Sequence, residues 1–131
     1  MDVPVYLADL HLRRAEWAVL LGRPIEARSA IVEARRTLDE VGSVATLESA
    51  AARLGAAVDF LEGNGSAGIG AMRRAGERAA QAGLPYEAAL ATTWCAQIGA
   101  RTGDPSEADG PAARIAVDRL AVGLIPVLRL P

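Results

Sequence analysis

The stretch LLGRPIEARSAIVEARRTLDEVG, residues 20–42, determines the expected fold, because it contains one complete helix with its start and stop signals. Pro24 is suited to the first turn of a helix, where its missing N–H is not needed. Apolar residues then recur at helical intervals, at Ile25, Ile31, Leu38 and Val41. A glycine flanks the helix at each end and can close a last turn in the left-handed conformation. We therefore predict a helix over 24–41.

The same glycine signal recurs along the whole chain at intervals of 20 or 21 residues, at Gly22, Gly42, Gly63, Gly83, Gly103 and Gly123. The segments between these glycines carry helical periodicity and no alternating strand pattern. Aromatic residues make up only 4% of the chain, which also disfavours a sheet. The sequence predicts an all-α fold of six helices joined by short turns, and hence antiparallel neighbours, over 5–21, 24–41, 46–62, 67–82, 86–102 and 105–122.

Composition limits the class of protein. The 131 residues are 51% hydrophobic and 23% charged with a net charge of −2, as expected for one globular domain without a strong field. A nucleic-acid partner is not expected, because the chain lacks the basic excess that binding phosphates requires. The single cysteine excludes an internal disulfide, and neither a secretion signal nor a membrane span is evident. We expect a cytoplasmic protein with no membrane partner.

Small residues keep a fixed register to every second glycine, which turns six helices into three related hairpins. Gly22, Gly63 and Gly103 are spaced 41 and 40 residues apart, and superposition on them compares the positions seven before, five after and twelve after each glycine. Eight of these nine positions hold alanine or glycine, and Ile115 is the exception. Small side chains at such positions allow two helices to approach closely. The aligned sets are Ala15–Gly22–Ala27–Ala34, Ala56–Gly63–Gly68–Ala75 and Ala96–Gly103–Ala108. The repeats then span about 5–42, 46–83 and 86–123, followed by an apolar tail over 124–131.

This pattern resembles the tetratricopeptide repeat, most closely in LLGRPIEARSAIVEAR, residues 20–35. The period near 40 residues is similar to that of the helical-repeat arms of large bacterial ATP-dependent transcription regulators. The resemblance implies an α-solenoid, a right-handed stack of three antiparallel hairpins in one domain. It also implies a non-catalytic module that binds a protein or peptide, in or related to a bacterial regulatory protein.

In such a stack the first helix of each hairpin lines a concave surface, and the resemblance assigns groove positions to this sequence. The candidate binding residues are Asp9, Leu12, Glu16, Arg53, Phe60, Thr93, Gln97 and Arg101. Val19, Ala50, Ala57 and Leu90 occupy further positions of the same register. The mixture of apolar, acidic and basic groups suits a peptide or a helix better than a phosphate polymer. We expect charge reversal at Arg53 to weaken partner binding without unfolding the protein.

Two other functional classes remain open. A small-molecule-binding protein or accessory enzyme would need an apolar cavity between hairpins, and Trp17, Phe60, Tyr86 and Trp94 are the aromatic candidates for lining it. An oligomerisation domain would use an apolar end of the stack. The tail LIPVLRLP, residues 124–131, offers such an end in place of a polar capping helix, and it suggests a homodimer.

No residue pattern indicates catalysis, a cofactor or a metal. His11 is the only histidine, and Cys95 lies in an apolar setting typical of a buried structural cysteine. The acidic pair at 39–40 follows Arg35 and Arg36, so surface ion pairing explains it. The spacing G-x-G-x-x-G at 63–68 lacks a preceding strand, and we interpret it as a turn with Ser66 as the N-cap of the next helix.

Overall fold

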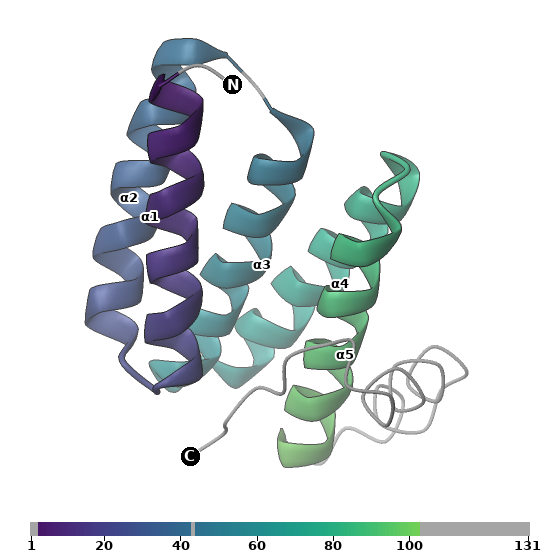
Figure 1. Cartoon of the computed structure of the whole chain (residues 1–131). Coiled ribbons are helices and arrows are strands. Elements are labelled where there is room, and N and C mark those ends of the chain that lie inside the picture. Colours follow the sequence, from purple (N-terminus) through teal and green to yellow (C-terminus); the bar gives the residue numbers. More distant parts are fainter. Residues whose placement is uncertain (1–2, 43, 103–131) are drawn as a thin grey trace.

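The computed structural model describes residues 3–42 and 44–102, with side chains to residue 99, and this part of the chain is all-helical (Figure 1). The helices are α1 (Val3–Leu20), α2 (Pro24–Val41), α3 (Ala45–Leu61), α4 (Gly65–Gln81) and α5 (Pro85–Thr102). Their bounds lie within two residues of the predicted ones, and the all-α prediction is confirmed. The predicted helix over 105–122, the glycines at 103 and 123 and the apolar tail lie outside the described residues.

Three of the turns are built in the same way, after Leu20, Leu61 and Gln81. Gly22, Gly63 and Gly83 all have positive φ, at 71°, 93° and 72°. Each glycine N–H donates to the carbonyl three residues back, and the next residue's N–H donates to the carbonyl five back. This is the Schellman motif, which satisfies the last carbonyls of a helix and needs a residue without a Cβ. In each case the next helix begins two residues after the glycine, and this short connection makes successive helices antiparallel.

The connection between α2 and α3 differs from these three. Gly42 has a φ of 92°, but its N–H donates to the carbonyl of Leu38, four residues back. At the other end of this connection, Val44 is extended and accepts the N–H of Glu48. The spacing of the glycines is therefore regular, while the geometry that each one supports is not.

The N-cap predicted for the fourth helix was wrong. The structure begins α4 at Gly65, with Asn64 in the N-cap position and accepting the N–H of Gly68 through its backbone carbonyl. Ser66 lies inside the helix and is not the cap. The element before this turn is α3, so the glycine-rich stretch over 63–68 is the end of a helix–helix turn and the first residues of α4, and no strand precedes it in the described part of the chain.

The helices pack in chain order, and the odd-numbered ones also meet one another. α1 packs along α2, α4 lies between α3 and α5, and α3 additionally contacts α1, α2 and α5. α1, α3 and α5 therefore follow one another side by side across the face seen in Figure 1. This arrangement is a helical bundle in which three helices share one surface.

The alanines at the register positions predicted from the sequence are part of the buried core. Ala15, Ala27, Ala34, Ala56 and Ala75 are all buried. Gly68, which takes the place of one alanine, allows the closest approach, because a Cβ built there would lie 2.9 Å from the backbone nitrogen of Phe60. Small residues thus bring the helix axes together, as the ridge-and-groove description of helix packing requires.

An ion-pair cluster on the outer surface ties α2 to the end of α3. The Nε and Nη2 atoms of Arg28 lie 3.0 and 2.8 Å from the two carboxylate oxygens of Glu62, and Nη2 lies 3.5 Å from Asp59. These hydrogen bonds are the main cause of the raised pKa of Arg28 and of the lowered pKa of Glu62. The Arg28 side chain is half-exposed, so water screens these contacts.

Candidate functional site

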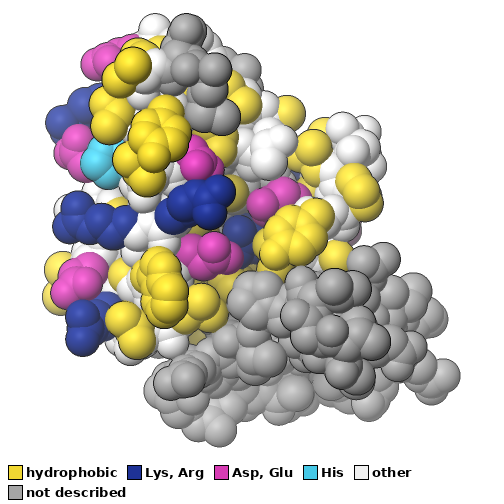
Figure 2. Space-filling view, viewed as in Figure 1, with side chains coloured by type: hydrophobic (Ala, Val, Ile, Leu, Met, Phe, Trp, Pro, Cys, Tyr) yellow, Lys and Arg dark blue, Asp and Glu magenta, His cyan; other side chains and the backbone are white. Residues whose placement is uncertain are grey.

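A groove runs between α1, α3 and α5, and it forms an open cavity of about 300 Å³. Figure 2 shows acidic and basic side chains gathered in the hollow between α1 and α5, with hydrophobic side chains on both sides. All three helices contribute to the lining of the cavity. The lining residues are Asp9, Leu12, Arg13, Glu16, Thr46, Leu47, Ala50, Arg53, Leu54, Tyr86, Glu87 and Leu90.

The floor of the groove is apolar. Leu12 comes from α1, Ala50 and Leu54 from α3, and Leu90 from α5, and all four are buried. Ala50 and Leu54 are four residues apart on α3, so they lie on one face of that helix. A ligand that entered the groove would therefore meet aliphatic surface at its base.

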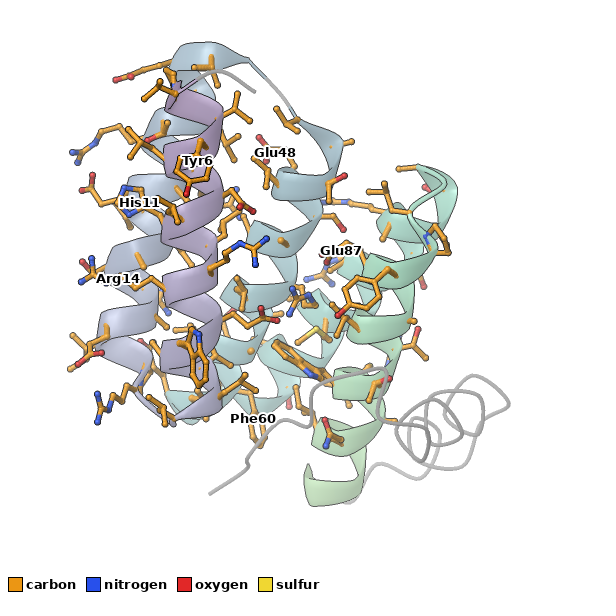
Figure 3. The ribbon with its side chains drawn as sticks, in the orientation of Figure 1. Tyr6, His11, Arg14, Glu48, Phe60 and Glu87 are labelled. Atoms are coloured by element: carbon orange, nitrogen blue, oxygen red, sulfur yellow. The ribbon has the colours of Figure 1, made fainter. Side chains whose placement is uncertain are left out.

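Arg53 lies in this floor as a buried cation, only 3% exposed. Its Nε atom donates to a Glu87 oxygen at 3.1 Å, and its Nη1 atom donates to a Glu16 oxygen at 3.4 Å. Its guanidinium carbon also lies 4.5 Å from the centre of the Trp94 ring, which is fully buried. Figure 3 shows Glu87 on the side of α5 that faces α3. Arg53 thus links α1, α3 and α5 through two carboxylates and an aromatic ring.

The local sequence explains why this arginine is inside. Residues 49–58, SAAARLGAAV, contain Arg53 as the only charged group among small and aliphatic residues. A helix that is apolar on nearly all sides is buried by its neighbours, and the guanidinium goes with it. A buried charge has to be paired and hydrogen-bonded, and stacking on an indole further suits the planar guanidinium.

The rim of the groove is polar. Arg13 donates through Nε to Asp9 at 2.9 Å, one helical turn away, and this hydrogen bond is the main cause of the raised pKa of Arg13. Across the groove Tyr86 is 56% exposed at the start of α5, and Thr46 is exposed at the start of α3. An apolar floor with a polar rim is the usual composition of a surface that binds a protein segment.

The structure brings half of the candidate binding residues together. Asp9, Leu12, Glu16 and Arg53 all line the cavity. Three of the other four lie apart from that lining: Phe60 is half-buried near the end of α3, Gln97 is partly buried on α5, and Thr93 is buried with its hydroxyl donating to the carbonyl of Ala89. The side chain of Arg101 lies outside the described residues.

The role expected for Arg53 needs a correction. We expected an accessible groove cation whose charge could be reversed without unfolding the protein. Its burial against Trp94 and its two carboxylate partners contradict that expectation. Reversal would place a third carboxylate beside Glu16 and Glu87 at a buried position, which destabilises the fold strongly.

Sequence reasoning missed Glu87, Leu47 and Leu54 as parts of this site, and it named Trp94 only as a candidate for lining an enclosed ligand cavity. Glu87 and Trp94 are seven residues apart and therefore lie on one face of α5, but the sequence does not show which face meets α3. The isolated charge within residues 49–58 was an available signal that Arg53 is buried and needs a carboxylate partner. Its partners, 34 and 37 residues away in the chain, depend on tertiary packing.

The four aromatic candidates for an enclosed ligand cavity are scattered. Trp94 is fully buried beneath Arg53, Tyr86 lines the groove, Phe60 packs against the core, and Trp17 is 67% exposed on α1. A second cavity, of about 220 Å³, lies between α2, α3 and α4 with part of the α4–α5 turn. Small and charged residues line it: Arg35, Ala45, Glu48, Ser49, Ala52, Ala75, Arg78, Ala79, Ala82 and Leu84.

Neither a metal site nor a membrane-spanning helix is found in the part of the chain that the structure describes. Within residues 3–42 and 44–102, no three histidine, cysteine, aspartate or glutamate side chains are placed to hold a metal ion. His11 lies on the side of α1 away from α5 (Figure 3), and Cys95 is buried, as expected for a structural cysteine. None of the five helices combines the length and the apolar character needed to cross a bilayer.

Comparisons of the chain with protein-family models, with curated proteins and with solved structures found no match.

Proposed function

We propose that this chain is a non-catalytic module that binds a protein or peptide in the groove between α1, α3 and α5. The observation that carries the proposal is the cavity of about 300 Å³, whose floor is aliphatic and whose lining comes from three helices far apart in the sequence. Concave apolar sites with a few placed polar groups are the usual form of a binding site. A helical groove of this kind accepts an extended segment or an amphipathic helix.

The proposed architecture is a tetratricopeptide-like, right-handed stack of about 40 residues per hairpin. The side-by-side order of α1, α3 and α5 and the repeated glycine turns support it. In such a stack the helices are formed before the ligand arrives, so less conformational entropy is lost on binding. We further propose a cytoplasmic setting, and a role within or beside a bacterial regulatory protein that acts through its partners.

The groove can be tested by filling it. Ala50 lies in the floor, and Ala52, on the same helix, lines the second cavity instead. Peptides are selected on the full chain from a displayed random library, and their affinities are then measured by fluorescence anisotropy. We expect Ala50→Phe to weaken binding about tenfold or more and Ala52→Phe to leave it unchanged. Equal affinity for the wild type and a folded Ala50→Phe variant would contradict the proposal.

A second candidate function is self-association, which an exposed apolar stripe on α1 favours. Val3, Tyr6, Leu10 and Trp17 are all exposed and recur every three, four or seven residues along that helix. Contiguous exposed apolar surface commonly marks an interface. Light scattering across a concentration series tests this function: we expect a dimer that Trp17→Ser converts to a monomer. A wild-type chain that stays monomeric at the highest concentration contradicts self-association.

A further inference from the structure

We propose that the segment bound in this groove carries a basic side chain, arginine or lysine, next to an aliphatic one. This inference rests on the proposed function and names the chemistry of the ligand. It follows from how charge is distributed among the groove residues. The floor selects the aliphatic side chain, and the walls select the basic one.

The charged groups that line the cavity do not balance. Asp9, Glu16 and Glu87 supply three carboxylates, against the guanidinium groups of Arg13 and Arg53. Arg13 and Asp9 neutralise each other as neighbours on α1. Arg53 then stands between two carboxylates, Glu16 and Glu87, so the lining of the groove carries one excess negative charge. That charge lies beside an aliphatic floor, where water screens it less than at an open surface.

The excess charge is most accessible at Glu16. Its side chain is 31% exposed, whereas that of Glu87 is 10% exposed. Glu16 is also the more distant partner of Arg53, at 3.4 Å against 3.1 Å. A carboxylate offers two oxygens and about four acceptor sites, so Glu16 can accept a donor from a ligand while it keeps its contact with Arg53. A ligand cation there would complete an alternating row of charges.

The same arrangement disfavours an acidic ligand. Arg53 is 3% exposed and already holds two carboxylates, so it has little to offer a third. An acidic side chain in the groove would face Glu16 and Glu87 across an apolar floor, and like charges there reduce affinity. Tyr86, exposed at the rim, adds an aromatic face on which a guanidinium or ammonium group can rest. Both features favour a basic side chain.

The experiment uses the peptides selected on the full chain from the random library. We expect the selected sequences to be enriched in arginine or lysine within two residues of leucine, isoleucine or valine. The best peptide is then compared with a variant in which its basic residue is replaced by glutamine. We expect affinity to fall about tenfold on this replacement and to fall by a similar factor for Glu16→Gln with the original peptide. Glu33→Gln, on α2 and paired with Arg36 away from the groove, is the matched control.

A double-mutant cycle separates this inference from a general loss of binding. If the ligand cation contacts Glu16, then Glu16→Gln has little further effect on the peptide that already lacks its basic residue. Enrichment of acidic or uncharged peptides, or equal affinity for the two peptides, overturns the inference. The peptide replacement needs no change in the protein, so this outcome does not depend on the stability of Glu16→Gln.

The two proposals can fail separately. If peptides without a basic residue bind and Ala50→Phe abolishes their binding, the groove binds peptides and only the charge inference is wrong. If no selected peptide is sensitive to Ala50→Phe, the proposed function fails, and with it the inference. Enrichment of basic peptides that lose affinity in both Glu16→Gln and Ala50→Phe supports both.

Discussion

Arg28 and Arg53 each contact two carboxylates, but the two arginines lie in different surroundings. Arg28 on α2 contacts Asp59 of α3 and Glu62, the residue that follows α3. Arg53 on α3 contacts Glu87 of α5 and Glu16 of α1. The shortest contact is 2.8 Å for Arg28 and 3.1 Å for Arg53. The Arg28 side chain is 50% exposed, whereas that of Arg53 is 3% exposed and lies on Trp94. Judged by distance alone, the exposed cluster has the better geometry.

The difference teaches that the contribution of an ion pair to stability depends more on its burial than on the distance between its nitrogen and oxygen atoms. Water competes for both partners of Arg28, and such exposed pairs contribute little to stability. Arg53 and Glu87 are both buried, so removing Arg53 leaves the carboxylate of Glu87 in an apolar setting, and removing Glu87 leaves Arg53 with the longer contact to Glu16. We therefore expect matched substitutions at the two clusters to have very different effects.

The largest effect on stability is expected from removing the Trp94 ring, on which Arg53 rests. Trp94→Ala leaves a large cavity in the core and takes away the surface on which the guanidinium rests, which should lower the free energy of unfolding by about 4 kcal/mol. The matched control is Trp17→Ala, since Trp17 is the other tryptophan and is mostly exposed. Urea denaturation followed by circular dichroism measures both. Similar losses for the two variants would contradict the packing described around Arg53.

Replacing the cations themselves gives the most direct comparison. Arg53→Met should cost about 3 kcal/mol, because it leaves the buried Glu87 without its partner, whereas Arg28→Met should cost less than about 1 kcal/mol. The double variant Arg53→Met with Glu87→Leu removes both buried charges and should recover much of the loss. Thermal denaturation of the three variants tests the comparison. If Arg28→Met proves as damaging as Arg53→Met, burial does not separate the two clusters.

Neutralising one carboxylate in each cluster is expected to have a smaller effect. Glu87→Gln keeps the shape and one acceptor oxygen but removes the charge next to Arg53, so we expect a loss of about 2 kcal/mol. Glu62→Gln changes the exposed cluster in the same way and should leave the melting temperature close to that of the wild type. The pair of melting curves, recorded at low and at high salt, shows which cluster is screened. A strong salt dependence of the Glu87→Gln effect would contradict its burial.

The smallest effect is expected from acid at the exposed cluster. The hydrogen bond from Arg28 holds the pKa of Glu62 below its usual range, so the folded state favours the ionised form. The contribution of Glu62 is therefore complete above the ordinary glutamate pKa and is lost as the pH falls through the lowered value. The wild type and Glu62→Gln should differ slightly at pH 7 and converge as the pH falls below the lowered pKa of Glu62. A difference that grows as the pH falls would have the wrong sign.

Much of the fold could be predicted from the sequence because its signals are local. The glycines at 22, 63 and 83 have the positive φ that their turns require, so they indicate where helices end. The small residues aligned with them are buried and indicate where helices pack closely. The N-cap of α4 was predicted wrongly, because Ser66 is a good cap by type while the Schellman turn at Gly63 had already fixed where the helix begins. A turn of defined length thus overrides a side-chain preference.

The groove was predicted only in part, because its chemistry depends on pairs that are distant in the chain. The resemblance to a repeat family identified the helices that line it, and Asp9, Leu12, Glu16 and Arg53 do line the cavity. It could not show that Arg53 is buried. Glu87 became a partner through the packing of α5 on α3, which no spacing rule describes.

The alanines in the core have a consequence for how the groove responds to a ligand. An alanine has no side-chain rotamers, so its burial costs almost no conformational entropy, and the contact it makes cannot be rearranged by rotating a bond. Buried alanines such as Ala15 on α1 and Ala56 on α3 therefore hold the helices at a fixed spacing, and Gly68 on α4 lies directly against the backbone of α3 at Phe60. Such a scaffold can adapt to different ligands at its long rim side chains, while the spacing of its helices stays fixed.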